Sequence, residues 1–414
     1  MGVREKNHFS RDDRDSKTYY HSCISFHFGI KLESSLRLTD VGPTEMLTRG
    51  GAPGLRWLEH ALSNSPIASA KKGVRLAPNL MKLDVDKDWV QLDPPTFGND
   101  MSNKYGLLDN EATRKNVLQL NINDERNESA QTEVWQLVRA HLLRRFPQHY
   151  SPVAGGNSEA LAIHVRGGVG GDIAKDFSAV IDPQQGTINP FEAAARSMQE
   201  DLLLMRACDD PSLERAPGVP EYHLAAAVCC FAFGNVLERA TEKHTMRQLH
   251  ESVGGYEADL ASIVARTMAK LPMGAAVCRS NWSLSFTGQL GNHPDRYLLN
   301  PAKRRRNFPD VVDDEWSGVD GAIRRLDIFG AAECMFTKVE YQTLRRLPNH
   351  PEFVLFTVRV FTEPFHLLTP ASAANLAKCI EYAQSHCIGA YKGLNDPRIT
   401  TRVLAFLKGQ ATQT

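Results

Sequence analysis

Two short segments carry more hydrogen-bond donors than an ordinary core strand. They are Cys278–Leu284, with the sequence CRSNWSL, and Tyr341–Pro348, with the sequence YQTLRRLP. Their polar members are Arg279, Asn281, Trp282, Gln342, Thr343, Arg345 and Arg346. Arginine presents a planar fork of donors that matches carboxylates. The segments therefore favour a site for an anionic or propionate-bearing ligand; the alternative is solvated strand ends with Trp282 in the core.

Two other features that could carry chemistry have simpler interpretations. His141 lies on the apolar face of a helix expected over Ala130–Arg145, which is typical of a core histidine rather than a ligand. The glycine-rich sequence VRGGVGGD, within 151–188, has no following GK[ST] and no GxGxxG spacing. We expect a flexible loop or hairpin there and no nucleotide site.

The composition excludes several classes of protein. The 414 residues contain 48 Lys and Arg and 48 Asp and Glu, so the formal charge is zero. This balance argues against nucleic-acid and polybasic membrane partners. No apolar run approaches the ~20 residues that span a bilayer, and the N-terminus has no apolar signal segment. The 8 cysteines are scattered without a CxxC motif, as in reduced proteins, so we expect a cytoplasmic location.

Strands are expected where β-branched and aromatic residues gather. The best candidates are Met335–Thr343 and Phe353–Thr362, and the turn sequence LPNHPE between them predicts an antiparallel pair. Cys278–Phe286 and His223–Phe233 are also expected to be strands, the second buried on both faces. Ile24–Ile30 could be a short strand.

Helices are expected where apolar residues recur at helical spacing. The expected ranges are 56–64, 130–145, 256–271, 370–385 and 397–409. A further helix should begin with Asn189 as N-cap and Pro190 at its first position and run into 199–205. We expect Pro94 and Pro95 to stop any regular element and 288–330 to be irregular.

Together these elements predict an α+β fold, with an antiparallel sheet and helices outside it. Residues 1–74 are expected to be a poorly ordered or accessory segment. Residues 75–395 would form the main domain, and 396–414 a C-terminal helix or tail.

Six motifs occur in the same order in heme-dependent oxidative N-demethylase-like proteins, and the chain resembles this family over residues 75–395. They are QEDL at 199–202, LHxxVxGY at 249–256, RxNWSL at 279–284, QTLRRLP at 342–348, LFTVR at 355–359 and YKG at 391–393. The resemblance implies a PAS-like antiparallel sheet flanked by helices that binds heme b. It also implies oxidation of a methyl group of a small methylated amine by O2, with electrons from a flavin-dependent reductase and release of formaldehyde.

The resemblance also suggests which residues would serve the cofactor. Heme needs an apolar slot, an axial ligand and cations for its propionates. The expected cofactor-binding residues are Arg279, Asn281, Arg345, Arg346 and Arg359. A regular strand cannot point both Arg345 and Arg346 inward. His250, in the LHxxVxGY motif, is the expected axial ligand and His223 the alternative, although His250 could instead bond backbone near a helix end.

Three residues are candidates for catalysis. Glu200 could position the amine or relay protons, as a buried carboxylate beside an ammonium would, although it could instead be an exposed helix position. Trp282 and Tyr341 could offer an aromatic face to a methylated ammonium, or could simply belong to the core.

The sequence departs from the family at two places. The family pattern CFPSRW is CFAFGN at Cys230–Asn235, and Ser252 and Gly254 replace both prolines of IHxPVPGY. The missing Arg and Trp leave three hypotheses open: a demethylating enzyme, a non-enzymatic heme sensor or scaffold, and a heme-free ligand-binding descendant.

Overall fold

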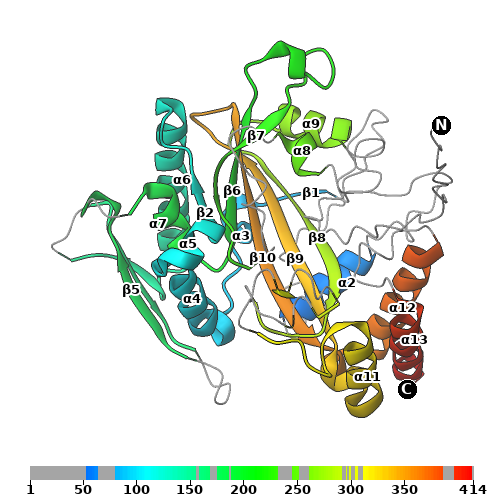
Figure 1. Cartoon of the computed structure of the whole chain (residues 1–414). Helices are drawn as coiled ribbons and strands as arrows, with labels where there is room; N and C mark the ends of the chain where they lie inside the picture. The colour runs from blue at the N-terminus through cyan, green and yellow to red at the C-terminus, as the bar shows by residue number, and fades with distance from the viewer. Residues whose placement is uncertain are drawn as a thin grey trace, which may run out of the picture.

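The computed structural model describes most of the chain from residue 53 onward. The described residues are 53–63, 80–154, 158–167, 175–185, 188–231, 245–250, 261–290, 295, 298–299, 304–305, 311–385 and 396–412. Within them the fold is α+β, as predicted, with one large and one small antiparallel sheet (Figure 1). The expected strand at Ile24–Ile30 lies outside the described residues.

The large sheet has seven strands within the described residues, in the order β1-β8-β9-β10-β6-β7-β2. Their bounds are β1 (Met81–Lys82), β2 (Leu118–Leu120), β6 (Asp201–Ala207), β7 (Tyr222–Val228), β8 (Ala276–Ser285), β9 (Phe336–Arg346) and β10 (Phe353–Pro364). The small sheet consists of β3 (Tyr150–Pro152), β4 (Leu161–Val165) and β5 (Phe177–Ile181). The predicted hairpin is confirmed, since β9 and β10 pair antiparallel along their whole length.

Helices surround the large sheet (Figure 1). Their bounds are α2 (Pro53–Ser63), α3 (Val85–Asp88), α4 (Pro94–Asp109), α5 (Glu111–Val117), α6 (Glu125–Arg145), α7 (Pro190–Arg196), α8 (Met246–Leu249), α9 (Ala261–Lys270), α11 (Gly318–Cys334), α12 (Pro370–Ser385) and α13 (Pro397–Ala411). The expected helices at 56–64, 130–145, 370–385 and 397–409 are thus confirmed. Among the described residues, none of these helices combines the length and apolarity that a membrane crossing needs.

The two faces of the large sheet have different neighbours. Tyr341 of β9 stacks on Trp57 of α2, with ring centroids 4.1 Å apart. Arg346 lies on the opposite face, because side chains alternate along a strand. It donates from Nη2 to the Met268 carbonyl of α9 at 2.8 Å. We call these faces the α2 face and the α9 face.

Two predicted elements were wrong. One concerns a pair of prolines, and the other a segment without hydrophobic alternation. Pro94 and Pro95 do not stop regular structure but begin α4, since a helix needs no backbone donor in its first turn. The helix predicted from Asn189 exists as α7 but ends at Arg196, and Asp201–Ala207 is strand β6 in the sheet interior. That strand is buried on both faces, so its run of leucines carries no alternation that separates strand from helix.

Two helices also differ from expectation. Residues 318–334 form α11, where we expected irregular structure; the helical backbone breaks at Gly330, and Ala322 and Leu326 are among the buried positions. Helix α6 begins at Glu125 because the Asp124 carboxylate caps it, accepting from Arg126 N at 2.9 Å. Of the helix expected at 256–271, residues 261–270 are confirmed as α9 and 256–260 lie outside the described residues.

Candidate functional site

The predicted site residues do not line a single cavity, because they lie on both faces of the large sheet. Arg279 pairs with Gln342 and Asn281 with Glu340 in the β8–β9 register, which puts them on the α9 face together with Arg346. On the α2 face lie Trp282, Tyr341, Arg345 and Arg359.

The α9 face carries a buried polar patch, which we define as Arg279, Asn281, Glu340 and Gln342. Their exposed fractions are 4, 6, 3 and 1%. Gln342 Nε2 donates to Glu340 Oε2 at 2.9 Å, and Lys338 Nζ lies 3.3 Å from Glu340 Oε1. The side-chain oxygen of Gln342, Oε1, is also buried and has no hydrogen-bond partner among the described residues. Such an acceptor is costly to leave unpaired, so it indicates a place where a ligand donor could bind.

Apolar side chains continue this face on the neighbouring strands. The β10 and β6 residues that share it are Val354, Phe356, Val358, Val360, Leu203 and Met205. All of them are buried. The α9 face therefore combines an apolar strip with a buried cation, Arg279, at its edge. A flat ligand with an apolar body and an acidic edge needs this combination.

Arg346 is on the same face but already connects two elements. Its Nη2 donates to the Met268 carbonyl at 2.8 Å and lies 3.4 Å from the Tyr222 hydroxyl at the start of β7. Arg346 therefore links α9 and β7 to the end of β9 through hydrogen bonds.

His250 follows α8, a short helix that begins with a capping box between Thr245 and Gln248. The ring is fully buried, and Nδ1 lies 2.7 Å from the Met246 carbonyl. A carbonyl oxygen only accepts, so Nδ1 carries the proton and Nε2 the lone pair. Burial lowers the pKa of His250 to about 4, so the ring is neutral near pH 7. A neutral imidazole oriented by a backbone carbonyl is the state that metal-ligating histidines have.

His223, the alternative ligand, has a different environment. It pairs with Arg206 of β6 and is half-buried, and its Nδ1 lies 3.4 Å from Cys208 Sγ. Burial lowers its pKa, and the Arg206 guanidinium adds to this. Among the described residues no group of three or more His, Cys, Asp and Glu side chains could hold a metal ion.

His141 is confirmed as a core histidine. Its exposed fraction is 2%, and its ring meets the Trp89 ring edge-on at 5.2 Å. Burial lowers its pKa to about 3. The ring is therefore neutral and part of the packing between α6 and the end of α3.

The QEDL motif connects two other segments, the one before α4 and the one after β7, to the start of β6. Gln199 Oε1 accepts from Asp93 N at 3.0 Å, at the beginning of α4. Glu200 Oε1 accepts from Gln91 N at 2.7 Å. Asp201 accepts from the backbone of Cys230 and Phe231, at the end of β7, at 2.9 and 2.8 Å. Each side chain thus has a role in holding the fold.

Glu200 is buried, and burial raises its pKa although the Arg359 guanidinium opposes the shift. Its second oxygen, Oε2, has no hydrogen-bond partner among the described residues. Arg359 is 1% exposed and its Nη2 lies 3.2 Å from Asp100 Oδ2 and 3.8 Å from Asp93 Oδ2. The Arg359 guanidinium is therefore paired with the carboxylates of Asp100, in α4, and of Asp93, the residue before α4.

The other α2-face candidates contact the first helices. The Tyr341 hydroxyl donates to the Asp88 carbonyl of α3 at 2.8 Å. The Arg345 guanidinium lies 4.1 Å above the Trp89 ring, and burial lowers its pKa to about 10. Trp282 is 5% exposed. Contact of these residues with a cofactor or substrate stays a prediction.

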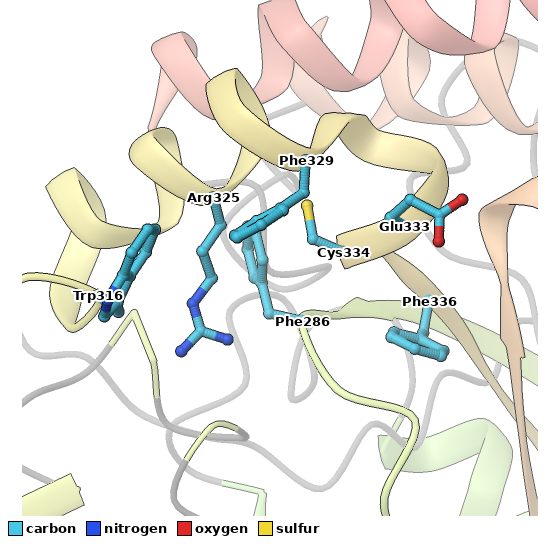
Figure 2. Close-up of a pocket in the computed structure, with 7 residues that line it drawn as sticks. All are labelled: Phe286, Trp316, Arg325, Phe329, Glu333, Cys334 and Phe336. Atoms are coloured by element: carbon cyan, nitrogen blue, oxygen red, sulfur yellow. The ribbon is translucent and has the colours of Figure 1, made fainter.

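Sequence reasoning missed a pocket at α11 (Figure 2). Its volume is about 440 Å³, and its lining residues are Phe286, Trp316, Arg325, Phe329, Glu333, Cys334 and Phe336. Part of the lining comes from the segment that we expected to be irregular. The only sequence signal was the spacing of Arg325 and Phe329, four residues apart, which puts them on one face of a helix; Glu333 follows a break in the helical backbone at Gly330.

Comparison with known proteins identifies a family. A family model described as haem-dependent oxidative N-demethylase, alpha subunit-like, matches residues 79–400. No curated protein matches the chain. The matched range includes β1 to β10 and every candidate residue described above.

Proposed function

The chain belongs to the haem-dependent oxidative N-demethylase, alpha subunit-like family, and from this premise we propose that it binds heme b and demethylates a small methylated amine. One O2, two electrons and two protons convert an N-methyl group into N–H and formaldehyde, with release of water. A flavin-dependent reductase would deliver the electrons. Heme supplies the iron at which O2 is bound and reduced.

The observation that supports this proposal most is the α9 face itself. A buried arginine, an unpaired buried acceptor and an apolar strip lie on one face of one sheet, and the face is covered in part by α9. These residues fit heme, whose propionates need a cation and whose ring needs apolar contacts.

We assign three residues to the cofactor. His250 would be the axial ligand through Nε2, since Nδ1 is held by the Met246 carbonyl. Arg279 would bind a propionate through its guanidinium fork, and Asn281 would donate a further hydrogen bond. Arg346 would act indirectly, by holding α9 against this face.

For the amine we assign Gln342 and Glu340. Gln342 Oε1 is a buried acceptor, and an N–H of the substrate could satisfy it. Glu340 would balance the ammonium charge beside it, in competition with Lys338 at 3.3 Å. The earlier candidates Glu200, Trp282 and Tyr341 would support the site from the opposite face of the sheet rather than touch the amine.

A non-enzymatic heme sensor or scaffold is the second candidate. Asp201 holds Cys230 and Phe231 at the end of β7, immediately before the place where this sequence lacks the Arg and Trp of the family. If those two side chains serve turnover, the chain could keep heme without demethylating.

Turnover distinguishes the two candidates. Heme-loaded protein would be mixed with a flavin reductase, NADH, O2 and dimethylamine, and formaldehyde would be measured. The enzyme proposal expects formaldehyde in proportion to NADH consumed, and a loss of at least tenfold in Gln342→Leu. Full heme loading without formaldehyde from any small methylated amine would instead favour the sensor.

A further inference from the structure

The α11 pocket is separate from the polar patch. Phe336, which lines the pocket, is the first residue of β9, whereas Gln342 lies about 20 Å further along the same strand at ~3.4 Å per residue. None of the lining residues belongs to the patch or to the proposed heme ligands. The pocket is therefore a second place where a small molecule could bind.

Aromatic rings form most of this pocket. Phe286 directly follows β8 and Phe336 begins β9, whereas Trp316 lies just before α11 and Phe329 within it. The Trp316 and Phe329 rings are 5.8 Å apart and tilted by 34°. Aromatic faces carry partial negative charge and attract cations.

The two charged side chains of the pocket differ in whether they have an ion-pair partner among the described residues. Arg325 is paired, since its Nη1 and Nη2 lie 3.3 and 3.4 Å from the Asp295 carboxylate. Glu333 is exposed and has no ion-pair partner among the described residues. Burial raises the pKa of Cys334 to about 11, so its thiol is neutral. One carboxylate therefore remains uncompensated.

The two charges lie at opposite ends of the pocket. Figure 2 shows Arg325 extending from α11 near Trp316, with Phe286, Phe329 and Cys334 between it and Glu333. The Glu333 carboxylate thus lies at the rim, at a distance from the guanidinium, and in Figure 2 it points away from the Phe286 and Phe329 rings.

We propose that this pocket binds a small alkylated ammonium cation. Glu333 supplies the counter-charge at the rim, and Phe286, Phe329 and Phe336 contact the alkyl groups through their rings. The volume of about 440 Å³ is that of an ordinary small-molecule site. The binding needs no heme, so it stands or falls independently of the proposed function.

Choline and its neutral isostere 3,3-dimethyl-1-butanol test this directly. Both would be titrated into the full chain without heme, with binding followed by calorimetry and by tryptophan fluorescence. Choline should bind more tightly than the alcohol. Glu333→Gln and Phe329→Leu should each lower the affinity for choline about two- to fivefold, as expected for partly exposed cation–aromatic contacts. Glu128→Gln, the same change on exposed α6, should leave the affinity unchanged.

Three outcomes would overturn the proposal: equal affinity for choline and the alcohol, tighter binding of benzoate than of choline, or an unchanged affinity in both pocket variants. Phe329 is 54% exposed, so its replacement by leucine leaves the core intact. Added hemin should not change the choline affinity, which separates a failure here from a failure of the heme site.

Discussion

Arg345 and Arg346 are consecutive residues whose guanidinium groups lie on opposite faces of one sheet. Arg345 lies 4.1 Å above the Trp89 ring on the α2 face, whereas Arg346 donates at 2.8 Å to the Met268 carbonyl on the α9 face. The two arginines of the QTLRRLP motif therefore have separate tasks, one for each layer of helices.

This separation predicts unequal effects of substitution. Arg346→Met removes a charge-assisted hydrogen bond to α9 and should lower the free energy of unfolding by about 1.5–3 kcal/mol. Arg345→Met keeps apolar contact with Trp89 and should cost about 1 kcal/mol or less. Urea unfolding followed by circular dichroism measures both values. Equal losses would contradict the separate tasks.

Lys104 should be among the most sensitive residues of the fold. It is fully buried, and its Nζ donates to the carbonyls of Ala195, Met198 and Glu200 at 3.2, 2.9 and 2.5 Å. Lys104→Met leaves these acceptors unpaired and should destabilise the protein by about 3 kcal/mol. Lys115→Met, on an exposed position of α5, is the matched control and should change little. Chemical denaturation of both variants decides the point.

Glu363 predicts a pH dependence of stability. Its carboxylate accepts from Gly54 N at the start of α2, and burial raises the pKa of Glu363 to about 7. Because the folded pKa is raised, the stabilisation is fully present below about pH 4.5, the unfolded value, and is lost as pH rises through 7.

The test compares the wild type with Glu363→Gln, because other groups also titrate in this range. The difference in unfolding free energy between the two proteins should change between pH 5 and pH 8, with the wild type losing stability relative to the variant. A difference that is constant across this range would mean that Glu363 does not titrate there.

Gly321 should be essential for the α11 pocket. A Cβ at this position would lie 2.1 Å from the Trp316 carbonyl carbon, and backbone cannot move aside cheaply. Gly321→Ala should therefore lower the melting temperature and weaken ligand binding in the pocket. Gly106→Ala, inside α4 with nothing within 4 Å, should be neutral or stabilising by up to ~1 kcal/mol. Differential scanning fluorimetry measures the melting temperatures of the two variants.

The sequence was informative where local chemistry is distinctive. The Pro and Asn residues of LPNHPE and the β-branched residues of Phe353–Thr362 predict the β9–β10 hairpin, and Asn189 with Pro190 predicts the start of α7. Strand β6 was missed because a strand buried on both faces has no alternation.

The site was less predictable than the fold. Arg279 and Asn281 lie together because they are two residues apart on one strand, which sequence alone predicts. The neighbours that define their chemistry, Glu340 and Gln342, depend on the β8–β9 register. No local pattern fixes a register between strands that are far apart in sequence.

The central claim, that this chain is a heme protein with His250 as ligand, is tested most directly by an absorption spectrum. Purified protein would be examined with and without added hemin, before and after dithionite, together with His250→Ala and His223→Ala. We predict a sharp Soret band that shifts on reduction, is lost in His250→Ala and persists in His223→Ala. A band that survives in His250→Ala would refute this ligand, and no band after reconstitution with hemin would contradict the heme proposal as a whole.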